Sequence, residues 1–231
     1  MNWLEAAVII ILAGCAIYGR WKGFIRTVFA LFSTIIALSL TMWVSPTVSR
    51  EVQKNEKIMT YVTEKVSKVI KPEKKNREIS EQVNYIGKLP LPKAMKNSLI
   101  ENNNTEVYTA MAVKSFQDYI SGSIARMIIN AGVFLIIMIV VLISMAILCE
   151  ALDIISKLPL INGLNKTAGL FAGLLQGIVI VWIGCIALTV LSGTKLGEAV
   201  FNLINGSTFL SLIYDNNLFL KFITNLGATL F

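Results

Sequence analysis

Residues 166–194 read KTAGLFAGLLQGIVIVWIGCIALTVLSGT, and this stretch decides the fold class. After its first lysine it carries no charged residue over 28 positions. Gly169, Gly173 and Gly177, the glycine ladder, recur at a spacing of four and share one face of a helix. Each would cost a helix in water about 1 kcal/mol relative to alanine. Inside a bilayer, closer van der Waals contact with a neighbouring backbone can offset that cost, so the stretch predicts helix packing in lipid.

The composition of the whole chain indicates a membrane protein. Of its 231 residues 55% are hydrophobic, and the mean hydropathy of +0.68 is high for a soluble domain of this length. About 20 apolar residues span a bilayer, and fewer suffice when the ends reach the interface. Four charge-poor stretches meet this requirement: residues 3–19, 27–45, 127–149 and 167–194. The sequence predicts an all-α membrane protein with four transmembrane helices, arranged as two hairpins with a helical extracytoplasmic insertion between them.

The residue types that the sequence lacks limit its chemistry. The chain has no histidine, which removes His-containing catalytic triads, His metal ligands and the usual general base near neutral pH. Its three cysteines lie within or at the end of apolar stretches, where thiols behave as small apolar side chains. Charges of both signs are interspersed, and no nucleic-acid reader motif is present. We therefore expect no enzymatic activity, no cofactor, no metal and no nucleic-acid partner.

The distribution of charge predicts the topology. Residues 46–123 hold 13 of the 21 basic and nine of the 14 acidic residues, so this segment is a mixed-charge polar domain. Segments longer than about 60 residues cross the membrane largely regardless of charge, whereas short loops follow the positive-inside rule. The first short connection carries Arg20, Lys22 and Arg26, and the second ends at Lys166. We expect both short connections in the cytoplasm, and both termini and residues 46–123 outside.

This topology divides the chain into four parts. Residues 1–45 form the first transmembrane hairpin, residues 46–123 the extracytoplasmic helical insertion, and residues 124–194 the second transmembrane hairpin with the glycine ladder. Residues 195–231 are apolar but interrupted, which predicts an interfacial tail. Within the insertion, valines at helical spacing between residues 48 and 69 predict an amphipathic helix. That helix either lies on an anionic membrane surface or packs on its own domain.

Three polar features need an explanation. The basic residues around Gly23 account for the topology by themselves, but the same turn could bind an acidic partner or an anionic lipid headgroup. Gln176, the only amide in the last span, either makes an interhelical hydrogen bond worth about 0.6–1 kcal/mol or lines a pathway. Arg126 lies at the edge of the third span, where it is expected to reach water or headgroups. An ionisable residue in a span core would indicate transport, and the sequence has none there.

Two motifs resemble the signatures of a known family. The first turn reads Lys22-Gly23-Phe24-Ile25-Arg26, and the last span begins with Asn165-Lys166 followed by the glycine ladder. In this order they resemble the R-G-F-x-R-E and D/N-R-x-x-G-x-x-x-G-x-x-x-G signatures of the colicin V production protein family of bacterial membrane proteins. Lysine stands here for the first arginine of each signature, and Thr27 replaces the acid.

The resemblance implies a multi-pass protein of the bacterial cytoplasmic (inner) membrane that is associated with toxin production or export and with envelope homeostasis. Two functions fit the chain. The first is a non-enzymatic scaffold or accessory that works in the lipid bilayer through a membrane or envelope protein partner, with homo-oligomers possible. The second is a small channel or transporter with a pathway near the fourth helix. The glycine ladder and the mixed-charge insertion favour the scaffold.

Overall fold

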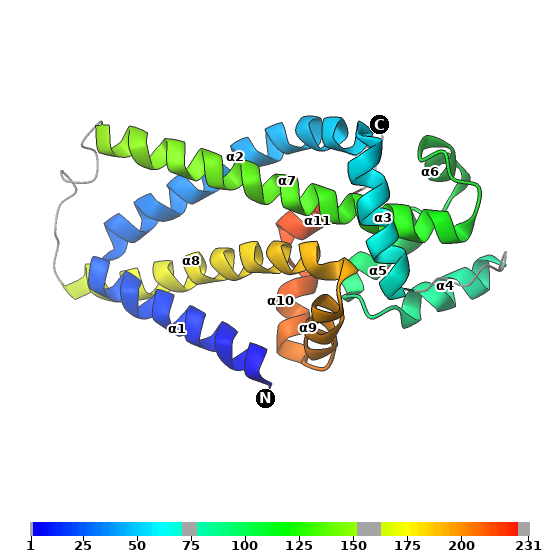
Figure 1. Cartoon of the computed structure of the whole chain (residues 1–231). Coiled ribbons are helices and arrows are strands. Elements are labelled where there is room, and N and C mark those ends of the chain that lie inside the picture. The colour runs from blue at the N-terminus through cyan, green and yellow to red at the C-terminus, as the bar shows by residue number, and fades with distance from the viewer. Residues whose placement is uncertain (1, 71–77, 152–162, 226–231) are drawn as a thin grey trace. The chain divides into compact units, whose positions relative to one another are not determined.

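The computed structural model describes residues 2–70, 78–151 and 163–225 (Figure 1). Every regular element in this part of the chain is helical. The helices are α1 (Trp3–Lys22), α2 (Phe24–Lys54), α3 (Glu56–Ile70), α4 (Ile79–Lys88), α5 (Lys93–Glu101), α6 (Thr105–Ala110), α7 (Phe116–Ala151), α8 (Gly163–Val190), the short 3-10 helix η1 (Leu191–Gly193), α9 (Lys195–Asn205), α10 (Thr208–Asp215) and α11 (Leu218–Thr224).

The predicted all-α class with four spans is confirmed. Four of the described helices are long and apolar enough to cross a membrane: Trp3–Lys22, Phe24–Lys54, Phe116–Ile147 and Asn165–Gly193. Each of them extends beyond its predicted stretch at one end or both, because helix formation does not stop where polar residues begin. Their pairing into two hairpins around an extracytoplasmic insertion stays a prediction. Much of the connection before the last span, residues 152–162, lies outside the described residues.

The chain divides into two compact units. Unit 1 contains Met1–Val44 and Leu135–Gly184, and unit 2 contains Ser45–Phe134 and Cys185–Phe231. Three long helices, α2, α7 and α8, contribute residues to both units. These bounds differ from the four parts expected from the sequence. Those parts were divided where the polarity of the sequence changes, whereas the two units are groups of residues that contact one another in space.

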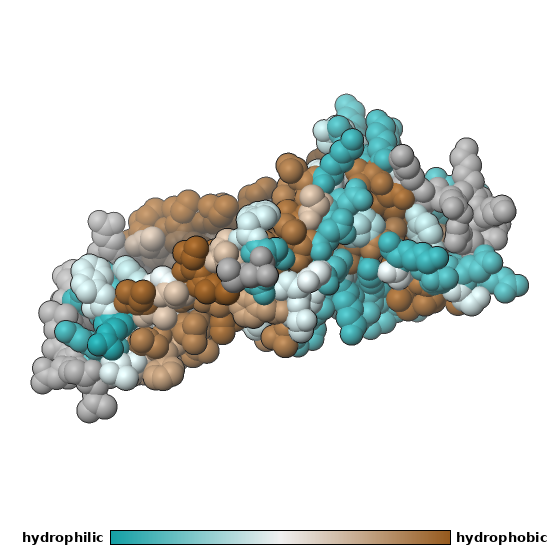
Figure 2. Space-filling view, turned by 90° about the horizontal axis from the view of Figure 1, so that it is seen from below, coloured by the Kyte–Doolittle hydropathy of each residue, from teal (hydrophilic) through white to brown (hydrophobic). Residues whose placement is uncertain are grey.

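The surface of unit 1 is apolar where a soluble bundle would be polar. On α7, one face carries large side chains that are each more than half exposed: Ile136, Ile139, Val140, Ile143 and Ile147. Figure 2, a view from below Figure 1, also shows hydrophobic residues, in brown, over much of the surface of unit 1. Because exposed apolar area costs about 25 cal/mol per Å² in water, a face of this kind indicates lipid as the surrounding solvent.

The length of α1 fits a bilayer. Its exposed tryptophans, Trp3 and Trp21, lie near opposite ends of the helix. At 1.5 Å per residue they are about 27 Å apart along the axis, close to the thickness of a hydrocarbon core of about 30 Å. Tryptophan prefers the membrane–water interface, so both ends of α1 lie where interfacial residues are expected.

Unit 2 has a hydrophobic core. Tyr119 and Ile124 of α7 are fully buried, as are Leu99 of α5 and Phe201 of α9. The Tyr119 hydroxyl donates a hydrogen bond of 2.6 Å to the Leu99 carbonyl oxygen, which satisfies the polar end of a buried ring. The core therefore combines residues from helices that are distant in sequence.

The predicted interfacial tail comprises α9, α10 and α11, and its apolar side chains are part of the unit 2 core. Leu220 and Ile223 of α11 are at most 3% exposed. The helices α9 and α10 are bent by 109° at a short break, a geometry compatible with one broken span or a re-entrant loop. Burial within the protein thus accounts for the apolar character of the tail, and its depth in the membrane stays a prediction.

The predicted amphipathic helix is interrupted at Asn55. The Asn55 side-chain oxygen accepts hydrogen bonds from the backbone N–H groups of Lys57 and Ile58, and so caps the start of α3. Val66 of α3 is fully buried, and the Ser67 hydroxyl donates to the Ser121 hydroxyl of α7 at 3.1 Å. These contacts agree with a helix that packs on its own domain.

Candidate functional site

The two sequence motifs lie side by side in unit 1. A Cβ atom added to Gly19 would overlap the Gly169 carbonyl oxygen and lie 2.7 Å from the Gly173 Cα atom. One added to Gly173 would overlap the Cys15 carbonyl oxygen, whereas real Cβ atoms essentially never approach within 3.0 Å. As residue numbers rise along α1, those of the facing residues on α8 fall, so the two helices are antiparallel. We call this region the motif junction.

The packing is backbone to backbone at Gly169 and Gly173 but looser at Gly177. A Cβ atom at Gly177 would meet the Cys15 Cβ atom at 3.0 Å and the Leu12 side chain at 3.2 Å. The glycine missed by the sequence analysis is Gly19, which precedes Gly23 by four residues. That spacing repeats the pattern of the glycine ladder and could have identified the partner face.

Asn165 joins the start of α8 to the turn between α1 and α2. Its side-chain oxygen accepts a hydrogen bond of 3.2 Å from the Ile25 backbone N–H, one of the donors that the first turn of a helix leaves without an intrahelical partner. Gly23 has a φ of +84°, and a Cβ atom there would lie 2.6 Å from the Asn165 side-chain nitrogen. The backbone conformation therefore favours glycine at this position, and a larger residue would also displace the Asn165 amide.

The turn itself is shorter than predicted. Residues 20–26 were expected to form it, but α1 continues through Lys22 and α2 starts at Phe24, which leaves Gly23 alone between them. Arg20 and Lys22 occupy the last turn of α1, where basic side chains interact favourably with the helix dipole. Lys166, in the first turns of α8, is exposed. The role of these charges in topology stays a prediction.

A cleft of about 380 Å³ lies beside the motif junction and is lined by residues of α1, α2, α7 and α8. Lys22 and Arg26 contribute two cations to it, and the Arg26 Nε atom is buried without a hydrogen-bond partner in the described part of the chain. Gln176 also lines this basic cleft. Among the described residues Gln176 makes no interhelical hydrogen bond, so the first of the two roles expected for it from the sequence is not seen.

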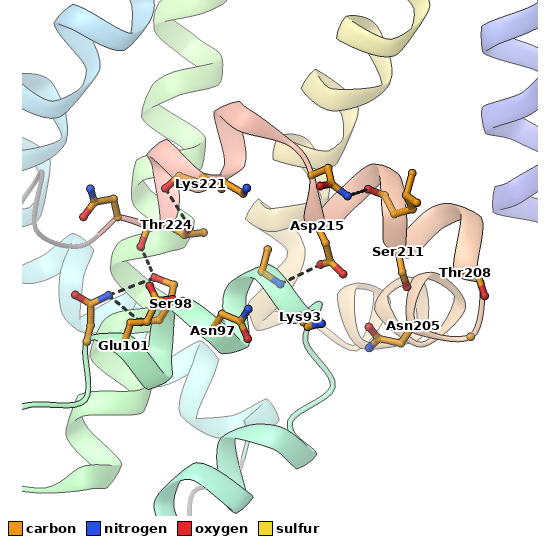
Figure 3. A pocket seen from close by; sticks show the side chains of 16 residues that line it. Lys93, Asn97, Ser98, Glu101, Asn205, Thr208, Ser211, Asp215, Lys221 and Thr224 are labelled. Atoms are coloured by element: carbon orange, nitrogen blue, oxygen red, sulfur yellow. Dashed lines mark hydrogen bonds between the residues drawn. The ribbon is translucent and has the colours of Figure 1, made fainter.

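A second site is a polar groove of about 1080 Å³ in unit 2 (Figure 3). One wall is α5, and the other walls come from α9, α10 and α11. The labelled residues on α5 are Lys93, Asn97, Ser98 and Glu101, and those opposite are Asn205, Thr208, Ser211, Asp215, Lys221 and Thr224. Amides, hydroxyls and charges of both signs dominate this lining. No residue of this polar groove was singled out from the sequence.

Hydrogen bonds hold the walls of the polar groove together. The Ala94 backbone N–H, at the start of α5, donates to the Asp215 carboxylate at 3.0 Å. The Ser98 hydroxyl donates to the Thr224 carbonyl oxygen at 2.6 Å. Burial lowers the pKa of nearby Lys96, and the negative charge of Asp215 opposes that shift. The polar groove is thus preformed by its own contacts.

A buried polar network connects α2, α7 and α11 in unit 2. An Arg126 guanidinium nitrogen donates to the Gln53 side-chain oxygen, and the Gln53 amide donates to the Asn130 side-chain oxygen at 2.7 Å. Asn130 in turn donates to the Ile223 carbonyl oxygen at 3.1 Å. Arg126 therefore has a partner inside the protein, which differs from the expectation that it reaches water or headgroups.

Four apolar helices and the exposed apolar faces of unit 1 define a helical, membrane-embedded protein. The family model described as Colicin V production protein matches residues 107–217. This match supports the resemblance to that family over this part of the chain. It includes Asn165 and the glycine ladder but not the first turn. No curated protein and no solved structure gave a significant match to the chain.

Proposed function

We propose that the chain is a non-enzymatic scaffold or accessory in a bacterial inner membrane, where it supports toxin production or secretion and envelope homeostasis by binding a partner protein. The observation that carries this proposal is the polar groove. Its location in unit 2, which contains all of residues 46–123, gives it an extracytoplasmic position in the predicted topology. A partner in the envelope could reach it there.

The lining of the polar groove supports a polypeptide ligand. Small-molecule sites usually have volumes of about 300–1,000 Å³ and mostly apolar walls. The polar groove, at about 1080 Å³, exceeds that range, and amides, hydroxyls and both signs of charge line it. Amide side chains offer donors and acceptors together, so they pair with a peptide backbone of any sequence, and the charged residues add selectivity.

The motif junction supports the scaffold role from the membrane side. Backbone contact at Gly19 and Gly173 leaves little freedom for α1 to move against α8. The Asn165 contact fixes the start of α2 in the same way. These contacts join α1, α2 and α8 into a rigid unit. Rigidity suits a protein that positions a partner.

Site-specific photo-crosslinking in cells tests the proposal. A crosslinker at Asn97, an exposed residue of the polar groove, should trap one defined protein, whereas a crosslinker at Asn202 should not. Asn202 is an equally suited control because it is an exposed asparagine of unit 2 outside the groove. In parallel, Asn97→Trp should reduce toxin secretion at unchanged protein level, and Asn202→Trp should not. Equal secretion by both variants, with no adduct at Asn97, contradicts the scaffold.

A small channel or transporter is the second candidate, because Gln176 lines a cleft that residues with hydroxyl side chains also line. Solute flux through purified protein in liposomes distinguishes the two functions. Flux that Gln176→Leu reduces favours the channel. An absence of flux, together with a trapped partner at Asn97, favours the scaffold.

A further inference from the structure

We propose that the basic cleft in unit 1 binds the phosphate-containing headgroup of an anionic phospholipid, with one acyl chain along its apolar wall. Such a site would make a specific lipid part of the folded transmembrane unit. The proposal does not depend on the polar groove or on the scaffold function, since it concerns other residues in the other unit.

The charges that line the basic cleft favour an anionic ligand. Lys22 on α1 and Arg26 on α2 line it together, and no carboxylate lines it within the described part of the chain. The buried Nε atom of Arg26 has no protein acceptor in that part. A buried donor of this kind is satisfied by a ligand oxygen, and the planar fork of arginine matches the geometry of a phosphate.

The remaining lining indicates a lipid and not a free anion. Leu142, Met145 and Ala146 of α7 form an apolar wall within the same cleft that holds the two cations. Inorganic phosphate would gain nothing from this wall, whereas an acyl chain would bury apolar area against it. Gln176 also lines the cleft, and an amide side chain can hydrogen-bond to a hydroxyl of a glycerol headgroup.

The depth of the basic cleft suits a headgroup. Lys22 and Arg26 flank the turn at the end of α1, next to the exposed Trp21. The Lys22 ammonium lies 5.1 Å from the centroid of the Trp21 ring, so cation and aromatic ring are held at one level. Tryptophan marks the membrane interface, and basic pockets between transmembrane helices on the cytoplasmic side are suited to anionic lipids.

Native mass spectrometry of the purified full chain, supplied with defined lipids, tests the proposal. Phosphatidylglycerol should remain bound under conditions that remove phosphatidylcholine, and soluble glycerol phosphate should not displace it. Arg26→Gln should weaken the binding of phosphatidylglycerol at least about tenfold, because a charge-assisted hydrogen bond is lost. Arg20→Gln removes the same charge from an exposed residue at the same turn but outside the cleft, and should leave binding unchanged.

A variant that keeps every charge guards against a folding defect of Arg26→Gln. Ala146→Phe fills the basic cleft from α7 and should also weaken phosphatidylglycerol binding. The proposal would be overturned if phosphatidylglycerol and phosphatidylcholine bound equally well. It would also be overturned if glycerol phosphate displaced phosphatidylglycerol at a concentration similar to that of the lipid. Equal losses in Arg20→Gln and Arg26→Gln would also overturn it, because the charge of the turn alone would then explain the binding.

Discussion

Replacing Gly173 by alanine tests whether backbone contact between α1 and α8 stabilises the transmembrane unit. A Cβ atom at this position would overlap the Cys15 carbonyl oxygen and lie 3.0 Å from the Gly19 Cα atom. Both neighbours are backbone atoms, so neither can move away without shifting a helix. Gly184, in the same helix, is the matched control, because a Cβ atom there would meet nothing within 4 Å.

The difference in unfolding free energy between the two variants measures the cost of the steric overlap at Gly173. Alanine is favoured over glycine in a helix by about 1 kcal/mol, and this gain applies at both positions. Overpacking of a tight contact costs about 1–3 kcal/mol. We therefore expect Gly173→Ala to be about 1–3 kcal/mol less stable than Gly184→Ala, which is roughly 5- to 150-fold in the unfolding constant.

Unfolding by sodium dodecyl sulfate in mixed micelles, followed by circular dichroism, measures this difference on the full chain. Gly184→Ala should unfold at the wild-type concentration of detergent or above it, and Gly173→Ala clearly below. The reasoning is refuted if both variants have the same free energy of unfolding within about 0.3 kcal/mol, the usual error of such comparisons.

Three further substitutions test other contacts. With the remaining cysteines replaced by alanine, Gly177→Cys should form a disulfide with Cys15 on mild oxidation. The two Cβ atoms would lie 3.0 Å apart, so they need to separate by only about 0.5 Å to reach the spacing of a disulfide. After cleavage at a protease site inserted between α3 and α4, the two fragments should stay joined until reduction, and early separation would contradict the contact. Gln53→Leu should lower the free energy of unfolding by about 1–3 kcal/mol, because a buried guanidinium loses its acceptor; an unchanged denaturation midpoint would argue against that bond. Asp215→Asn should lower the pKa of Lys96 further, because it removes the negative charge that opposes the effect of burial. A lysine-selective NMR titration measures this shift, and a rise in the pKa would disprove the assignment.

Local sequence patterns predict the spans but not which helices meet. A long apolar run is sufficient to identify α8, because the bilayer imposes one length and one polarity on every span. The glycine ladder also identifies the face of α8 that packs closely. Its partner Gly19 lies 150 residues before Gly169 in the sequence, and no local pattern connects the two.

The polar groove could not be predicted, because its parts are ordinary when taken separately. Asn97 and Asn205 each look like a solvated residue of a short helix, and only the fold brings their helices to the same groove. In the tail, by contrast, the apolar pattern was visible in the sequence, but its surroundings were not. A short apolar helix has the same periodicity whether it lies on a membrane or in a protein core, so the burial of Leu220 could not be read from the pattern.

The turn illustrates a third limit, since the residues were identified correctly and their conformation was not. Residues 20–26, with three cations, were predicted to form a tight turn, but most of them continue the two helices, and one glycine at positive φ is enough to reverse the chain. This difference has a chemical consequence. Lys22, at the end of α1, and Arg26, in the first turn of α2, line the same cleft.

The two sequence motifs are in direct contact although 140 residues separate Ile25 from Asn165. Gly23 leaves the space that the Asn165 amide occupies, and Asn165 supplies the acceptor that the start of α2 lacks. The Asn165 side chain thus has room only because residue 23 is glycine, and the Ile25 N–H has an acceptor only because residue 165 is asparagine. The connecting chain passes through unit 2, whose length does not enter this geometry. Changes in the length of unit 2 should therefore leave the motif junction intact, as long as Gly23 and Asn165 are kept.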